Sequence, residues 1–108
     1  MASDKSYLDY ILEQLSLLPE ISARAMMGEY VLYYRGRVFG GIYDNRFLVK
    51  ITPSSRAMMP AAETQLPYEG AAGMLLVDDV ENREFLADLV AAMYEDLPAV
   101  RKRGKRLR

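Results

Sequence analysis

Strand-forming runs separated by tight turns fill the segment 24–52, and this pattern constrains the fold more than any other feature. Residues 30–34 and 38–43 are rich in aromatic and β-branched side chains, which suit the pleated surface of a sheet. The stretches 35–37 and 44–45 contain glycine, asparagine or aspartate, which tight turns favour. Because strands joined by tight turns pair antiparallel, the segment predicts an antiparallel meander.

Three or four strands are expected before the loop and one after it. Their ranges are 24–27, followed by a break at Gly28, then 30–34, 38–43 and 47–51, and finally 74–77. In the fourth strand Phe47, Val49 and Ile51 are expected to share one face, because successive side chains alternate. Leu48 and Lys50 then lie on the opposite face. One helical turn after a serine cap is expected at residues 54–59, and a loop at residues 60–73.

A segment with helical periodicity precedes the strands. Within residues 4–18 six apolar side chains form one stripe, namely Tyr7, Leu8, Ile11, Leu12, Leu15 and Leu18. Ser3 or Asp4 is expected to cap the first turn by accepting hydrogen bonds from backbone N–H groups. Pro19 is expected to end the helix, because proline disfavours helical geometry at the residue before it.

A second helical segment follows the last strand and ends before Pro98. Its apolar stripe consists of Phe85, Leu86, Leu89, Val90, Met93 and Leu97. Asp78 or Asp79 is expected to cap this helix. The element order predicts an α+β fold, an antiparallel β-sheet meander flanked by N-terminal and C-terminal helices that lie on the sheet. One domain is expected over residues 1–98.

The missing residue types limit the chemistry of the chain. Its 108 residues include no cysteine and no histidine, so the commonest general base, the thiolate nucleophile and the preferred zinc ligands are absent. An enzyme built from carboxylates or tyrosines would need a deep pocket, and we expect no catalysis. The acids Asp78, Asp79 and Glu81 fit a helix start better than a metal site.

Gly40-Gly41 matches no nucleotide-binding motif, so no cofactor is expected, and a closely packed helix is the expected reason for this pair. No apolar run reaches the roughly 20 residues of a membrane span. The N-terminus lacks the apolar core of a signal peptide, and we expect a cytoplasmic protein that does not bind membranes.

Charge is unevenly distributed along the chain. The final eight residues hold six of the fourteen basic side chains: Arg101, Lys102, Arg103, Lys105, Arg106 and Arg108. This leaves eight basic against fifteen acidic residues in 1–100, a net charge of −7. A disordered basic tail is therefore expected at residues 99–108. It either contacts phosphates of a nucleic acid such as DNA, or serves only as a solvated terminus.

Tyrosines gather in the expected strands. The run 30–34 has no polar alternation, so the helices are expected to cover one of its faces and a partner or second subunit the other. Core packing explains the same pattern. The candidate partner-binding residues are Arg24, Tyr30, Tyr34 and Lys50. Single charges within strands also commonly just face water, and that alternative applies to Arg24 and Lys50.

Several short motifs resemble a known family by their order and spacing. They are the run from Arg24 to Tyr30, Tyr33-Tyr34 with Gly36, Val38-Phe39-Gly40, Phe47-Leu48-Val49-Lys50, Pro67-Tyr68 and the closing Leu97-Pro98. Together they resemble the N-terminal domain of TfoX/Sxy proteins over nearly all of residues 4–98.

The resemblance implies an α+β domain with a central antiparallel sheet and no enzymatic activity. TfoX/Sxy proteins are regulators of bacterial natural competence that are thought to act with a transcription factor at promoters. Full-length members add a C-terminal helical domain where this chain has its basic tail, so a stand-alone N-terminal domain is expected. We therefore expect a regulatory module that binds a protein, either a transcription factor or a polymerase component. A monomer and a homodimer are both compatible with the sequence. Nucleic-acid binding through the tail is the alternative.

Overall fold

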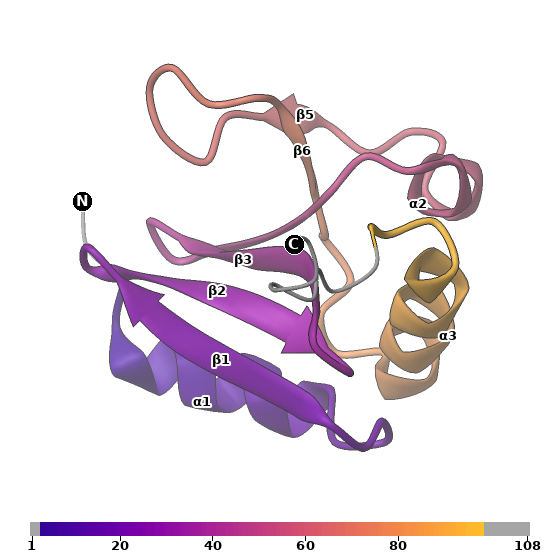
Figure 1. Ribbon diagram of the computed structural model, residues 1–108, viewed down its shortest axis with the longest axis horizontal. Helices are drawn as coiled ribbons and strands as arrows, with labels where there is room; N and C mark the ends of the chain where they lie inside the picture. Colours follow the sequence, from indigo (N-terminus) through magenta and orange to yellow (C-terminus); the bar gives the residue numbers. More distant parts are fainter. Residues whose placement is uncertain (1–2, 99–108) are drawn as a thin grey trace, which may run out of the picture.

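The structure, a computed structural model, describes residues 3–98. The elements are α1 Lys5–Gln14, β1 Ile21–Met26, β2 Glu29–Tyr34, β3 Arg37–Tyr43, β4 Arg46–Val49, α2 Pro53–Met58, β5 Thr64–Gln65, β6 Met74–Leu76 and α3 Arg83–Tyr94. The six strands form one antiparallel sheet in the order β1-β2-β3-β4-β6-β5. The α+β class is confirmed, with a helix at each end of the described chain and the sheet between them (Figure 1).

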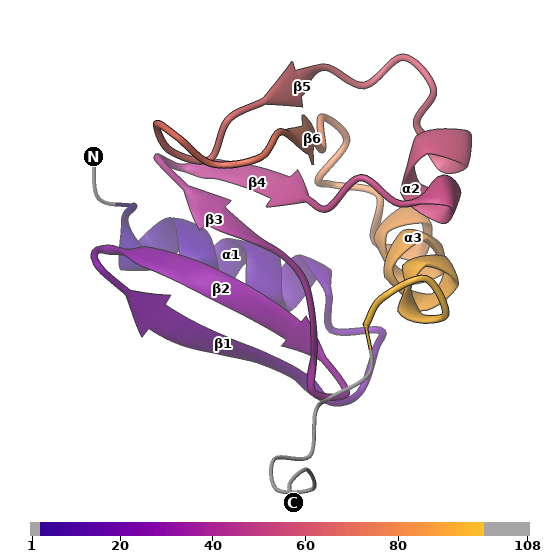
Figure 2. The same cartoon turned by 45° about the horizontal axis from the view of Figure 1, so that its top comes forward.

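One face of the sheet packs against the helices and forms the core. Leu32, Gly40, Val49 and Leu75 lie opposite one another in adjacent strands, so they share this face. The same buried cluster includes helix residues from both ends of the chain, namely Leu8, Ile11, Leu15, Leu86, Leu89, Val90 and Met93. In Figure 2, α1 lies behind the sheet and shows between β2 and β3, and α3 stands beside the sheet. Residues of both helices thus pack into one core with this face of the sheet, as the sequence predicts.

The first helix is shorter than its apolar stripe predicts. It ends at Gln14 instead of residue 18, because the chain must turn before Pro19 to enter β1. Asp4 occupies the N-cap position, but its side chain makes no capping hydrogen bond. The Ser3 hydroxyl instead donates to the Glu29 carboxylate at 2.5 Å, which ties the N-terminal segment to β2.

The boundaries of the first strand were also predicted wrongly. Pairing with β2 begins at Ile21, three residues before the expected start, and ends at Met26. Met27 and Gly28 form the hairpin turn, with φ angles of 54° and 86°. A two-residue turn with both φ angles positive suits the twist of paired strands, so the break at Gly28 is a turn.

The fourth strand is displaced toward the N-terminus. It runs from Arg46 to Val49, and the predicted member Ile51 is 46% exposed beyond its end. Phe47 and Val49 share the core face as expected, because they pair with Ile42 and Gly40. Leu48 lies on the opposite face, yet it is fully buried.

Local capping differs from prediction at both later helices. Thr52, and not a serine, caps α2, and its side chain accepts from the Ser55 amide at 3.0 Å. Asn82, and not Asp78 or Asp79, caps α3, because its side chain accepts from the Phe85 amide at 3.0 Å.

The expected loop at residues 60–73 contains the two-residue strand β5, which pairs with β6.

Neighbouring strands, and not a packed helix, explain the glycine pair in β3. A Cβ atom at Gly40 would overlap the backbone of Leu48 and Val49 in β4. A Cβ atom at Gly41 would lie 2.5 Å from the Tyr30 carbonyl oxygen in β2 and equally close to the Tyr43 ring. The close approach accompanies a register shift in the β2–β3 pairing.

Among residues 3–98, no helix combines the length and the hydropathy needed to cross a bilayer.

Candidate functional site

The sheet face that points away from α1 and α3 is the candidate site. Directly paired residues of adjacent strands point to the same face of a sheet. One such row crosses β1 to β4 on this face and consists of Arg24, Val31, Gly41 and Leu48. Figure 2 looks onto it at β1 and β2. We call it the open face and define it by Ser22, Arg24, Val31, Tyr33, Val38, Tyr43, Leu48 and Lys50.

The four candidate residues from the sequence do not form one surface. Tyr34 is buried on the helix side, where its ring lies 5.4 Å from that of Tyr94 in edge-to-face geometry. Tyr30 is half-buried and packs against the core on the same side. Arg24 and Lys50 lie on the open face. The structure therefore brings the two cations to one side and the two tyrosines to the other.

Arg24 lies beside a tyrosine that the sequence prediction did not select. Its guanidinium carbon is 5.8 Å from the centre of the Tyr33 ring, within the range of a cation–π contact. These two residues line a hollow of about 380 Å³ together with Ser22, Ala23 and Gly36. Strand alternation within the run 30–34 separates Tyr33 from Tyr30 and Tyr34, but it does not indicate which of them faces away from the helices.

A second hollow of about 360 Å³ lies on the open face beneath the segment between β5 and β6. Its lining includes Val38, Tyr43, Lys50 and Met74 from the strand side and Tyr68 from the segment above. The rings of Tyr43 and Tyr68 are 6.1 Å apart. The hollow is therefore aromatic and apolar with one ammonium group beside it.

Arg46 fixes the segment that borders this second hollow. Its guanidinium donates to the Gln65 side-chain oxygen at 2.8 Å and to the Leu66 carbonyl oxygen at 3.1 Å. Its Nε donates to the Tyr43 carbonyl oxygen at 3.0 Å. One side chain thus joins β3, β4 and the start of the segment, so the hollow has a defined wall.

Two cationic side chains and a buried phenol set the electrostatics of the open face. Within residues 3–98, neither Arg24 nor Lys50 takes part in an ion pair. Burial, and then the neighbouring Tyr68 and Glu29, raise the pKa of Tyr43 above its ordinary value. This phenol therefore stays protonated at neutral pH, when it can donate a hydrogen bond.

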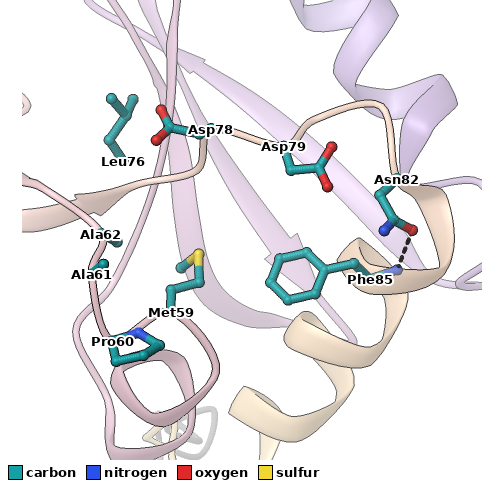
Figure 3. A pocket seen from close by; sticks show the side chains of 9 residues that line it. All are labelled: Met59, Pro60, Ala61, Ala62, Leu76, Asp78, Asp79, Asn82 and Phe85. Carbon is teal, nitrogen blue, oxygen red and sulfur yellow. Dashed lines mark hydrogen bonds between the residues drawn. The ribbon is translucent and has the colours of Figure 1, made fainter.

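A further hollow of about 320 Å³ lies at the start of α3 (Figure 3). Met59, Pro60 and Phe85 give it an apolar wall. Figure 3 shows the carboxylates of Asp78 and Asp79 pointing away from each other. In the described part of the chain, no three carboxylates come together in a way that could hold a metal ion.

The predicted nucleic-acid contacts of the tail lie outside the described residues. They are Arg101, Lys102, Arg103, Lys105, Arg106 and Arg108.

An antiparallel sheet with terminal helices on one face and an open opposite face defines the class of this α+β domain. The family model of the TfoX N-terminal domain matches residues 13–96. The chain belongs to this family, which confirms the resemblance seen in the sequence.

One curated relative covers almost the whole chain. It is described as an uncharacterized 12.7 kDa protein in the trpE 5′ region of Spirochaeta aurantia. The two sequences are 35% identical over 104 residues, which span 95% of this chain and 90% of the relative. No solved structure matches the chain.

Proposed function

We propose that this chain is a non-catalytic regulatory module of the cytoplasm that binds a protein through its open face. Membership of the TfoX N-terminal domain family supports a regulatory role. The observation that carries the proposal is that Arg24 and Lys50 have no ion-pair partner within residues 3–98 and lie beside tyrosines on the open face. The partner is a transcription factor or a polymerase component that acts in competence gene expression.

The chemistry of the open face indicates what the partner segment carries. The ammonium of Lys50 and the guanidinium of Arg24 would pair with carboxylates, whereas the exposed ring of Tyr68 would contact apolar side chains. Tyrosine and arginine are enriched among the residues that dominate binding energy at protein interfaces. A segment with alternating acidic and apolar residues therefore fits this face.

Site-specific photocrosslinking in the native bacterium tests the proposal. A photoreactive phenylalanine analogue replaces Tyr33 or Tyr68 on the open face, or Tyr10 on α1 as the control. We expect positions 33 and 68 to capture the same transcription factor or polymerase subunit, and position 10 not to capture it. Capture from position 10 alone, or from none of the three, would contradict the proposal.

Nucleic-acid binding through the tail is the second candidate, and the six basic residues among 101–108 favour it. Six phosphate contacts predict a slope of about −5 for log affinity against log salt concentration. Gel shifts at several salt concentrations would compare the full chain with a chain that ends at Val100. Equal binding by the two chains would exclude the tail as the binding element.

A further inference from the structure

The strand β1 forms one edge of the sheet and has a free side. It pairs only with β2, and in Figure 2 no other labelled element lies beyond it. Five of its six residues are exposed. The backbone on its outer side therefore has no strand partner among the described residues.

The register identifies the backbone groups that point outward. The Arg35 amide donates to the Glu20 carbonyl oxygen at 3.0 Å, directly before the first pair of the β1–β2 ladder. Hydrogen-bonded and non-hydrogen-bonded pairs alternate in an antiparallel ladder. Bonding to β2 therefore involves Ser22, Arg24 and Met26. The N–H and C=O groups that face away from β2 belong to Ile21, Ala23 and Ala25.

This edge lacks the usual features that prevent strand pairing. Natural edge strands are protected by proline, by bulges, by inward-pointing charges or by a covering element. The segment Ile21–Met26 contains no proline, and its pairing with β2 is regular throughout. Its single charge, Arg24, lies on the open face. The outer side of β1 is therefore competent to accept another strand.

We propose that two copies of this chain pair antiparallel through β1 about a two-fold axis at Ala23. In this register Ala23 faces Ala23 of the second copy, Ile21 faces Ala25, and Arg24 faces Ser22. A register centred on Arg24 would instead place two like charges directly opposite each other, which is destabilising. The exposed alanines at 23 and 25 leave room for the second strand.

Exposed apolar residues at the two ends of β1 support the same arrangement. Met26 is 46% exposed and Met27 is 97% exposed at one end, while Leu17 is 55% exposed in the turn before the other end. Two-fold pairing about Ala23 places Met27 of one copy beside Pro19 of the other, close to Leu17. Methionine adapts readily to such contacts because it is flexible and polarisable.

The dimer joins two sheets into one and leaves both open faces on the same side, because the two-fold axis is perpendicular to the sheet. A partner would then meet two copies of the open face next to each other. Pairing through β1 uses neither Lys50 nor Tyr68, so the dimer and the proposed partner site can be tested separately.

Single cysteines test the register in the full chain, which has no cysteine of its own. In the proposed dimer the Cα atoms of the two residues at position 23 lie about 5.5 Å apart, within the range of a disulfide. Two residues at position 25 lie roughly 13 Å apart along the strands. Under mild oxidation we expect Ala23→Cys to form a covalent dimer at least about tenfold faster than the matched control Ala25→Cys.

A proline variant tests the association without a crosslink. Ala23→Pro removes an N–H group that faces away from β2, so the fold is expected to persist, as circular dichroism can confirm. We expect sedimentation equilibrium to show a dimer for the native chain and a monomer for Ala23→Pro. A monomeric native chain, or equal crosslinking from positions 23 and 25, would overturn the proposal.

Discussion

The two faces of the central sheet differ in what covers them. On the helix side Phe39, Ile42 and Phe47 are completely buried against α1 and α3. On the open face Arg24 is exposed and Tyr33 is only half-buried. One face therefore supplies most of the hydrophobic stability, and the other retains an exposed cation beside a half-buried aromatic ring.

The open face is itself covered in part. Tyr43 and Leu48 are buried although they point away from the helices, and the ring of Tyr68 lies over Tyr43. Arg46 fixes the segment that contains Tyr68 to the sheet. The segment between β5 and β6, and not a helix, thus covers part of the open face. This cover does not extend to Arg24, which is exposed.

Removal of a large core side chain should produce the largest effect. Phe47→Ala deletes a fully buried ring from the helix side, and we expect a loss of about 3–5 kcal/mol in the free energy of unfolding. The matched change Tyr33→Ala on the open face should cost about 1 kcal/mol or less. Urea unfolding measures both, and similar losses would contradict the difference between the faces.

A methyl group at Gly40 should have the next largest effect. It would overlap the backbone of β4, and we expect Gly40→Ala to cost about 1–3 kcal/mol. Gly70→Ala is the control, because its Cβ atom meets open space and only its φ of 89° opposes the change. In thermal unfolding, Gly40→Ala should have a lower melting temperature than Gly70→Ala. The reverse order would contradict the close approach of β3 and β4 at Gly40.

Asp96 follows α3 and binds the start of α2, and its contribution to the free energy of unfolding should depend on pH. Its carboxylate accepts from the Ser54 amide at 2.9 Å, which lowers the pKa of Asp96 below its usual value. The ionised Asp96 carboxylate therefore stabilises the folded chain at pH values above its pKa in the unfolded chain. This stabilisation is lost as the pH falls through its lower pKa in the folded chain.

Asp96→Asn should therefore be less stable than the native chain near neutral pH. The difference should disappear once the pH lies below the lowered folded pKa of Asp96, where the native carboxylate is protonated. Stability curves for both chains over this pH range measure the effect. A difference that stays constant across the range would show that ionisation of Asp96 plays no part.

Periodicity in the sequence predicted the elements and their order well. The apolar stripes of both terminal helices and the turns at 35–37 and 44–45 are local signals, and the structure contains each of these elements. The boundaries were less predictable because pairing determines them. Ile21 joins β1 only because Tyr34 lies opposite it, and β5 exists only because Thr64 pairs with Leu75.

The candidate site was harder to predict than the fold. The side of the sheet to which a tyrosine points depends on strand phase, and the run 30–34 has no polar residue to set that phase. Tyr30 and Tyr34 consequently turned out to face the helices, while Tyr33 lies beside Arg24. The choice of Asn82 as helix cap likewise depends on the path of residues 77–82, which composition does not determine.

The central claim is that the open face, and not the helix side, binds the protein partner. A chain with both Arg24→Glu and Lys50→Glu reverses the two cations of this face, and a chain with Lys5→Glu and Arg83→Glu makes the same charge change on the helices. We measure photocrosslinked partner from position 68 in both backgrounds, after confirming that the first pair changes stability by no more than about 0.5 kcal/mol. We expect only the open-face pair to abolish capture. Undiminished capture by that folded variant would contradict binding through the open face.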